Sequence, residues 1–135
     1  MIYLEKNCLG KKLAAWAKFS GEDLWVLVNG GDLDHIGSLS LGLPRPSLTG
    51  DASPRATVST FNVTGHKDDA VGNMFADRLA SAFGCRVSVS CGIHFNGLDP
   101  ENLPEVISAA EALLTALENA LRTEGDSGPP KPCPR

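Results

Sequence analysis

The 135-residue sequence lacks several features that identify common classes of protein. It has no basic excess, since 12 Lys and Arg stand against 16 Asp and Glu, and a net charge of −4 predicts no nucleic-acid partner. No apolar run approaches the ~20 residues of a membrane-spanning helix, so we expect no membrane association. No apolar run follows a basic region at the N-terminus, which predicts the absence of a signal peptide and a cytoplasmic location.

Motifs for nucleophilic catalysis, redox chemistry and nucleotide binding are also missing. There is no Gly-x-Ser-x-Gly, Gly-x-Gly-x-x-Gly or Walker-type loop, and no internal repeat is evident. The cysteines form no Cys-x-x-Cys pair, and without a secretion signal we expect reduced thiols at Cys8, Cys85, Cys91 and Cys133.

Composition divides the chain into one folded domain and a tail. Residues 124–135 contain four of the nine prolines and almost nothing apolar, which predicts a flexible tail. Residues 1–123 remain as a single domain, long enough for one core. Residues 99–124 hold six acids and one base, a net charge of −5, which leaves +1 for the rest of the chain. The acidity therefore belongs to one surface element.

The first half of the sequence shows strand patterns separated by turn residues. We expect strands at about 2–8, 11–19, 23–29, 36–41 and 55–64. Residues 43–54 hold three prolines and a glycine, which predicts a twelve-residue loop able to act as a movable flap.

The second half predicts two helices with a strand between them. Apolar residues recur at spacings of three and four from residue 67 to Gly84, and again from Asp99 or Leu103 onward, and both stripes are typical of core packing. In residues 85–96 the odd positions are apolar and the even positions are polar or Gly, as in a strand with one buried face. The order β-β-β-β-β-α-β-α predicts an α+β fold, a mostly antiparallel sheet of five to six strands with both helices on one face.

Each of the three histidines lies in a short Gly- or acid-rich motif at a predicted strand end or strand-to-helix turn. The motifs span residues 30–37 around His35, 65–69 around His66, and 92–96 around His94. Rigid scaffolds often present functional groups at such positions, so the motifs would form a pocket if they met at one rim of the sheet.

Two chemical interpretations of these motifs stay open. A metal could be held by His35, His66, His94 and Asp68, although no pair has helical i, i+3 or i, i+4 spacing, and ordinary hydrogen-bonding histidines are the alternative. An anion could be held by Gly65, His66 and Lys67 before a helix, whereas Asp68 and Asp69 fit a plain capped helix equally well. Trp16 and Trp25 either stack on a flat ligand or fill a sheet face or dimer interface.

The same motifs resemble a known family, the small LpdD-type proteins that accompany hydroxyarylic acid decarboxylases of the UbiD type, such as gallate decarboxylase. The resemblance runs from about residue 10 to 122 and rests mainly on the strings at 30–42, 64–80 and 89–103. Their most specific pieces are His-Ile-Gly, Gly-His-Lys-Asp-Asp and Gly-Ile-His-Phe-Asn. The Pro-rich tail lies outside the resemblance.

The resemblance implies a non-catalytic chaperone that binds prenylated FMN and delivers it to, or protects it for, a partner decarboxylase. The flavin prenyltransferase is a possible second partner, and FMN itself a possible ligand. The family's motif histidines fall on His35, His66 and His94. The alternative is a metal-dependent decarboxylase, or a regulatory decarboxylase subunit, that uses the same three histidines.

The chemistry of prenylated FMN suggests a role for each motif. Its phosphate needs cationic or N–H donors, for which we expect Gly65, His66 and Lys67. The polar edge of its ring needs hydrogen-bond partners, for which we expect His35, His94 and Asn96. Its apolar face needs cover from Ile36, Leu39, Trp25 or a second subunit, with Gly37 beside them. We therefore expect a homo-oligomer with sites near an interface.

Overall fold

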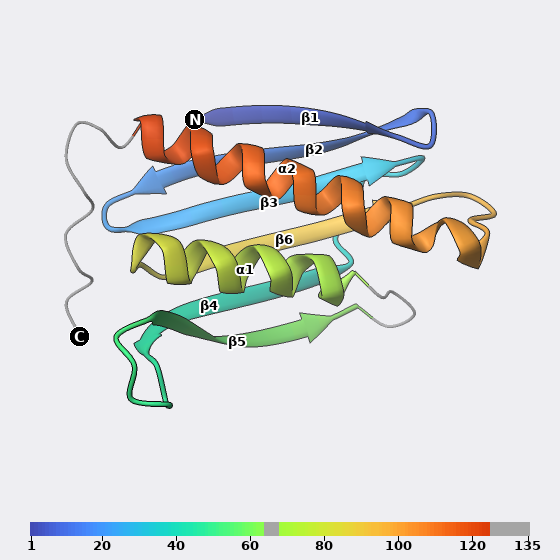
Figure 1. The fold of residues 1–135 in the computed structure, drawn as a ribbon. Helices are drawn as coiled ribbons and strands as arrows, with labels where there is room; N and C mark the ends of the chain where they lie inside the picture. The colour runs from blue at the N-terminus through green and yellow to red at the C-terminus, as the bar shows by residue number, and fades with distance from the viewer. Residues whose placement is uncertain (64–67, 125–135) are drawn as a thin grey trace.

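The computed structural model describes residues 1–63 and 68–124, and its elements follow the predicted order (Figure 1). This part of the chain forms one six-stranded sheet with two α-helices and a short 3-10 helix. The strands are β1 (Ile2–Cys8), β2 (Lys11–Ser20), β3 (Asp23–Gly31), β4 (Ser38–Pro46), β5 (Pro54–Asn62) and β6 (Val87–His94). The helices are α1 (Asp69–Phe83), η1 (Pro100–Asn102) and α2 (Leu103–Glu124).

The sheet is mostly antiparallel, as predicted, with the strand order β1-β2-β3-β6-β4-β5. Among the described residues four neighbouring pairs are antiparallel, and β3 and β6 pair in parallel. The parallel pair arises because the chain crosses from β5 through α1 and inserts β6 between β3 and β4. The predicted α+β class is confirmed.

The predicted twelve-residue loop is wrong, because strands occupy both of its ends. β4 continues to Pro46 and β5 begins at Pro54, which leaves only residues 47–53 between them. Pairing of β4 with β6 ends at Gly42, so the last residues of β4 pair with β5 alone. A proline is tolerated there because its missing N–H would face an unpaired edge.

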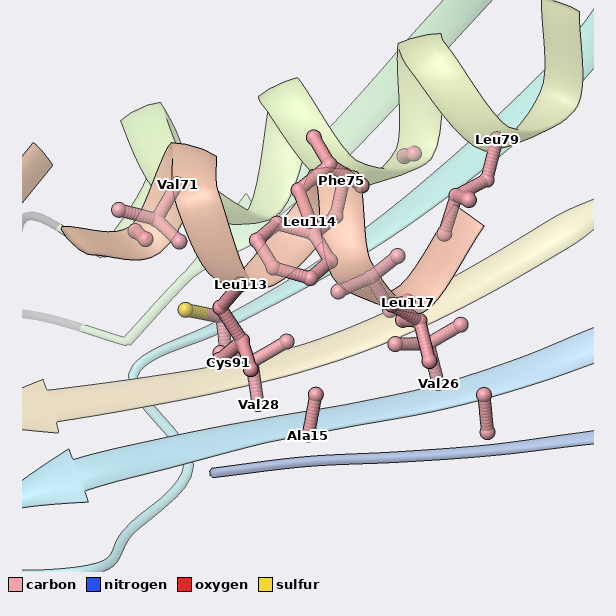
Figure 2. Close-up of a cluster of buried hydrophobic side chains, with 14 of the residues drawn as sticks. Ala15, Val26, Val28, Val71, Phe75, Leu79, Cys91, Leu113, Leu114 and Leu117 are labelled. Carbon is pink, nitrogen blue, oxygen red and sulfur yellow. The ribbon is translucent and has the colours of Figure 1, made fainter. Parts of the chain in front are cut away.

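Both α-helices pack on one face of the sheet, as predicted (Figure 1). α1 lies on β4, β5 and β6, whereas α2 lies on β1 and β2. Figure 2 shows Phe75 of α1 and Leu114 of α2 directed toward β3, which carries Val26 and Val28. α1 ends at Gly84, whose φ of 61° is the left-handed conformation expected after a helix.

The described helices include none that is both long and apolar enough to cross a bilayer. Glu124, assigned to the predicted tail, is the last residue of α2. The other residues of that tail, 125–135, lie outside the described residues.

Candidate functional site

Two of the three histidine motifs meet at one end of the sheet. Because β3 and β6 are parallel, their carboxyl ends lie side by side, with Gly31 opposite His94. β4 begins at the same end, where Ser38 pairs with Cys91, and α1 starts nearby at Asp69. His35 lies in the segment that joins β3 to β4, so its motif reaches the same rim.

His35 and Asp68 form the centre of this rim. Nε2 of His35 lies 3.2 Å from Oδ2 of Asp68, and the two side chains are only 13% and 9% exposed. Nδ1 of His35 donates to the carbonyl oxygen of Leu33 at 3.1 Å. The other carboxylate oxygen of Asp68 accepts from the backbone N–H of Ile93 at 3.0 Å. Asp68 therefore joins the His35 segment to β6.

The two acids at the start of α1, Asp68 and Asp69, have different roles. Asp68 occupies the N-cap position of α1, yet its side chain makes no capping hydrogen bond to the helix. Its carboxylate is used by His35 and Ile93 instead. Asp69 supplies the acidic side chain of the first turn. Asp68 therefore does not cap α1 with its side chain, whereas Asp69 lies in the first turn, where an acid complements the helix dipole.

His94 lies beside His35 and is held by a second set of bonds. The centroids of the two rings are 6.3 Å apart and the rings meet edge to face. Nε2 of His94 lies 3.0 Å from Oδ1 of Asn96, and the N–H of Asn96 donates to Asp32 at 2.9 Å. The bond from Asn96 and the nearby Lys11 ammonium lower the pKa of Asp32 below its ordinary value. Asp32 is thus a part of the rim to which the sequence gave no role.

Two glycines make room for the His35–Asp68 pair. A Cβ on Gly37 would overlap the Asp68 carboxylate, and a Cβ on Gly92 would overlap the His35 carbonyl group. Gly37 also donates to the carbonyl of Cys91 and accepts from the N–H of Val63, both at 2.9 Å. Ile36, between His35 and Gly37, is exposed. Close backbone approach therefore explains the glycines of both motifs.

A cavity of about 770 Å³ opens beside this rim, between the first turns of α1 and α2. Its polar lining includes Asp68 and His94. Most of its wall is apolar and comes from α1, α2, the end of β6 and the segment after β6, namely Val71, Ile93, Phe95, Leu98, Leu103, Val106 and Ile107. Val106 and Ile107 belong to the apolar stripe of α2, which the sequence pattern assigned to core packing. Ile107 is partly exposed because it lies at the edge of that stripe. Its position in the stripe is the only feature of the sequence that points to this wall.

The other predicted site residues lie elsewhere or outside the described residues. Trp25 and Leu39 line a groove on the opposite face of the sheet, because strand alternation directs them away from the helices. The structure therefore separates these two side chains from the cavity. Three further predicted residues, Gly65, His66 and Lys67, lie outside the described residues.

Metal-binding and nucleophilic groups were the remaining expectations. Within residues 1–63 and 68–124, no three His, Cys, Asp or Glu side chains gather closely enough to hold a metal ion. The metal proposal also needs His66, which is not among these residues. Cys8, Cys85 and Cys91 are buried, and burial raises the pKa of the Cys91 and Cys8 thiols. Both thiols are therefore neutral at pH 7 and poor nucleophiles.

The fold and the rim define a small α+β domain with a mostly apolar cavity at the carboxyl ends of two parallel strands. This chain belongs to the prenylated flavin chaperone LpdD-like family, whose family model matches residues 7–122. The resemblance expected from the histidine motifs is thereby confirmed.

Solved structures with the same fold include one that is similar over nearly the whole domain. It is a chain of a chaperone complex for yeast 20S proteasome assembly, with a TM-score of 0.55 and 13% sequence identity. The alignment covers 92% of this chain and 98% of that one. At this identity the likeness supports the fold alone. No curated protein matches the chain.

Proposed function

We propose that this protein is a non-catalytic chaperone for prenylated FMN, which it delivers to, or protects for, a partner aromatic acid decarboxylase. The observation that carries the proposal is the cavity of about 770 Å³, in which apolar walls meet His94 and Asp68. Membership of the prenylated flavin chaperone family supports the choice of ligand and the non-catalytic role. We further propose that the protein acts in the cytoplasm, with the flavin prenyltransferase as a second partner.

The cavity suits the ring system of a flavin. Cofactor pockets are mostly apolar, measure about 300–1,000 Å³ and carry a few polar groups that fix orientation. Phe95 and Ile107 offer apolar surface to the ring faces, while His94 and Asp68 can bond to the N–H and C=O groups of its polar edge. FMN has the same polar edge and phosphate, so we expect it to bind as well.

The residues around the cavity take supporting roles in this proposal. His35 and Asn96 hold Asp68 and His94 in place, and Gly37 leaves room for the Asp68 carboxylate. Ile36 adds exposed apolar surface beside His35. For the phosphate we propose Gly65, His66 and Lys67, which precede α1 in the sequence, because N–H groups at a helix N-terminus favour anions.

A flavin titration of two matched variants tests the site. Ala70 is an exposed residue of the first turn of α1 and lines the cavity, so the indole of Ala70→Trp should fill its entrance. Ala116 is an exposed residue of α2 outside the cavity lining, and Ala116→Trp is the control. We expect Ala70→Trp to lose at least about tenfold in affinity for FMN, or about 1.4 kcal/mol, and the control to bind normally. Equal affinities would place the ligand elsewhere.

A further inference from the structure

The first half of α1 forms one wall of the cavity beside His94. Asp69, Ala70 and Val71 line the cavity from this half, and the first turns of α2 line it from another side. A movement of the first half of α1 would therefore change the width of the cavity. How firmly these residues pack on the sheet decides whether such a movement occurs.

The second half of α1 is firmly packed. It buries Phe75 and Leu79 completely in the core (Figure 2). Its backbone also lies close to β4, since a Cβ on Gly42 would come within 2.5 Å of the carbonyl oxygen of Ala76. Close packing of large apolar side chains makes this half the fixed part of the helix.

The first half of α1 rests on β4 and β5 through polar groups instead. Oγ of Ser40 donates to Oδ1 of Asn73 at 2.9 Å, and the hydroxyl of Thr60 donates to the same oxygen. Gly72, the neighbouring residue of the helix, has no side chain to pack. Hydrogen bonds between neutral groups are replaced by bonds to water when a contact opens, so they stabilise the packed position only weakly.

Ser38 destabilises the packed position of this half. It is fully buried, and its hydroxyl finds no hydrogen-bond partner within the described residues. A Cβ on Gly72 would come within 3.0 Å of this hydroxyl oxygen, so the helix leaves little room for a water between them. A buried hydroxyl without a partner has lost its hydration and gained nothing in return. Movement of the helix away from β4 would let water reach it.

The start of the helix is also weak in itself. Gly72 lies within α1, where glycine is less favourable than other residues because of its backbone freedom. Asp68 stands at the N-cap position, but its side chain does not stabilise the helix end by a capping bond. Segments with few buried apolar contacts are the ones that open locally in a folded protein.

Asp68 opposes this opening. Its carboxylate lies 3.2 Å from Nε2 of His35 and accepts from the N–H of Ile93 at 3.0 Å. These two bonds tie the residue before α1 to the segment after β3 and to β6. Hydrogen bonds to a charged group are stronger than bonds between neutral groups, so Asp68 holds the start of α1 in place.

We propose that residues 69–73 of α1 form a movable wall of the cavity. In the closed position Asp68 is bonded to His35 and Ile93, and the Ser38 hydroxyl is dry. In the open position those bonds are broken, Ser38 is hydrated, and the wider cavity admits or releases its ligand. The proposed function enters only in naming that ligand as a flavin, because the movement is a property of the chain alone.

Hydrogen exchange of the ligand-free full chain, measured by NMR at single amides, tests the movement. The amides of Gly72 and Asn73 should exchange at least about a hundredfold faster than those of Leu79 and Ala80, after correction for intrinsic rates. Low concentrations of urea should leave the faster pair unchanged, because a local opening exposes little surface.

Ser38 and Ser40 provide a matched pair of variants, since both face α1 from the same strand. Ser38→Ala removes the hydroxyl without a partner, and we expect exchange at Gly72 and Asn73 to slow at least about threefold. Ser40→Ala removes a bond to Asn73 and should accelerate the same amides by a similar factor. Simple fraying of the first turn, with Ser38 still buried, would leave Ser38→Ala without effect and would overturn the proposal.

Asp68→Ala tests the bonds that hold the wall closed. It should accelerate exchange at Gly72 and Asn73 at least about tenfold, whereas the control Asp69→Ala should change it less than about threefold. Equal acceleration by both variants would overturn the role of Asp68. If Asp68→Ala does not fold, the two serine variants still decide whether the wall moves.

Stopped-flow binding of FMN connects the movement to the cavity. Ser38→Ala should slow association and dissociation of FMN by the same factor as hydrogen exchange and leave Kd unchanged. Unaltered rates with normal FMN binding would overturn the wall's role, since the ligand would then enter without it. Absence of FMN binding to every form would contradict the proposed function instead, and the exchange rates would still decide whether the wall moves.

Discussion

At the scale of single residues, the candidate site depends on how closely backbone and side chain approach each other. The His35 ring reaches Asp68 because the His35 backbone rests directly on Gly92. In the amide orientation that satisfies its neighbours, Asn29 donates to the carbonyl oxygens of Gly92 and His35, at 3.2 and 3.0 Å. The His35 segment is therefore held by close contact with the backbone of Gly92 and by hydrogen bonds from the amide of Asn29.

Gly92→Ala should disturb this arrangement, because the new Cβ would overlap the His35 carbonyl group. Overpacking of this kind costs about 1–3 kcal/mol in the free energy of unfolding. A domain of this size should then lose roughly 3–10 °C in Tm, as measured by thermal unfolding. Ser88→Ala is the control, because Ser88 lies on the same face of β6 four residues before Gly92. This substitution should leave Tm nearly unchanged. A Gly92→Ala protein as stable as the wild type would show that the segment shifts without strain.

Several residues of the candidate site could be predicted from the sequence, but the hydrogen bonds that connect them could not. His35 and His94 were identified because they lie at the ends of predicted strands, where a sheet presents its functional groups. The bonds of Asp68 to His35 and Ile93 join residues 25 to 33 positions apart, and no local pattern specifies such contacts. The cavity wall at Phe95 and Ile107 was missed for the same reason, since it exists only once α2 has docked.

At the scale of the elements, Glu118 couples the two α-helices. Its carboxylate accepts from Nε of Arg78 on α1 and from Arg122 one turn later on α2, both at 2.7 Å. The guanidinium of Arg122 also lies 5.3 Å from the centre of the Phe83 ring. Burial alone would raise the pKa of Glu118, but the bonds from Arg122 and Arg78 outweigh it and lower the pKa below the ordinary 4.5.

The pH dependence of stability should reveal this coupling. Because the folded-state pKa of Glu118 is lowered, its stabilisation is fully present above about pH 4.5 and is lost as pH falls through the folded value. Glu118→Gln should therefore be less stable than the wild type by about 1 kcal/mol at pH 7. The difference should shrink in acid, as thermal unfolding from pH 7 to pH 3 would show.

The exposed Glu111 provides a control on the same helix. Glu111→Gln should give a difference from the wild type that is small at every pH. A constant deficit for Glu118→Gln down to pH 3 would mean that Glu118 acts through packing, not through its charge.

The elements themselves were more predictable than their ends. Alternation and helical spacing identified every strand and α-helix of the described chain, because both periodicities are local. The Pro-rich segment 43–54 was assigned wholly to a loop, since proline usually breaks strands. Pro44 and Pro46 are accommodated because only β5 pairs with that end of β4, a fact that depends on the sheet order.

At the scale of the whole molecule, the order of the strands decides where the site lies. Insertion of β6 between β3 and β4 brings the Gly31 and His94 ends together. Neither composition nor periodicity specifies that insertion, so the sequence could predict an α+β class but not this topology. The same arrangement places the cavity on the face of the sheet that carries the helices.

The most direct test of the central claim is native mass spectrometry of the chain after co-expression with a flavin prenyltransferase. We expect a species heavier than the protein by one prenylated FMN per chain. In Ala70→Trp this species should be strongly reduced, and in Ala116→Trp it should persist. A wild-type chain that carries no flavin, although the prenyltransferase has made the cofactor, would contradict the proposed function. Chelator-sensitive turnover of an aromatic acid by the chain alone would contradict it equally, because it would identify an enzyme.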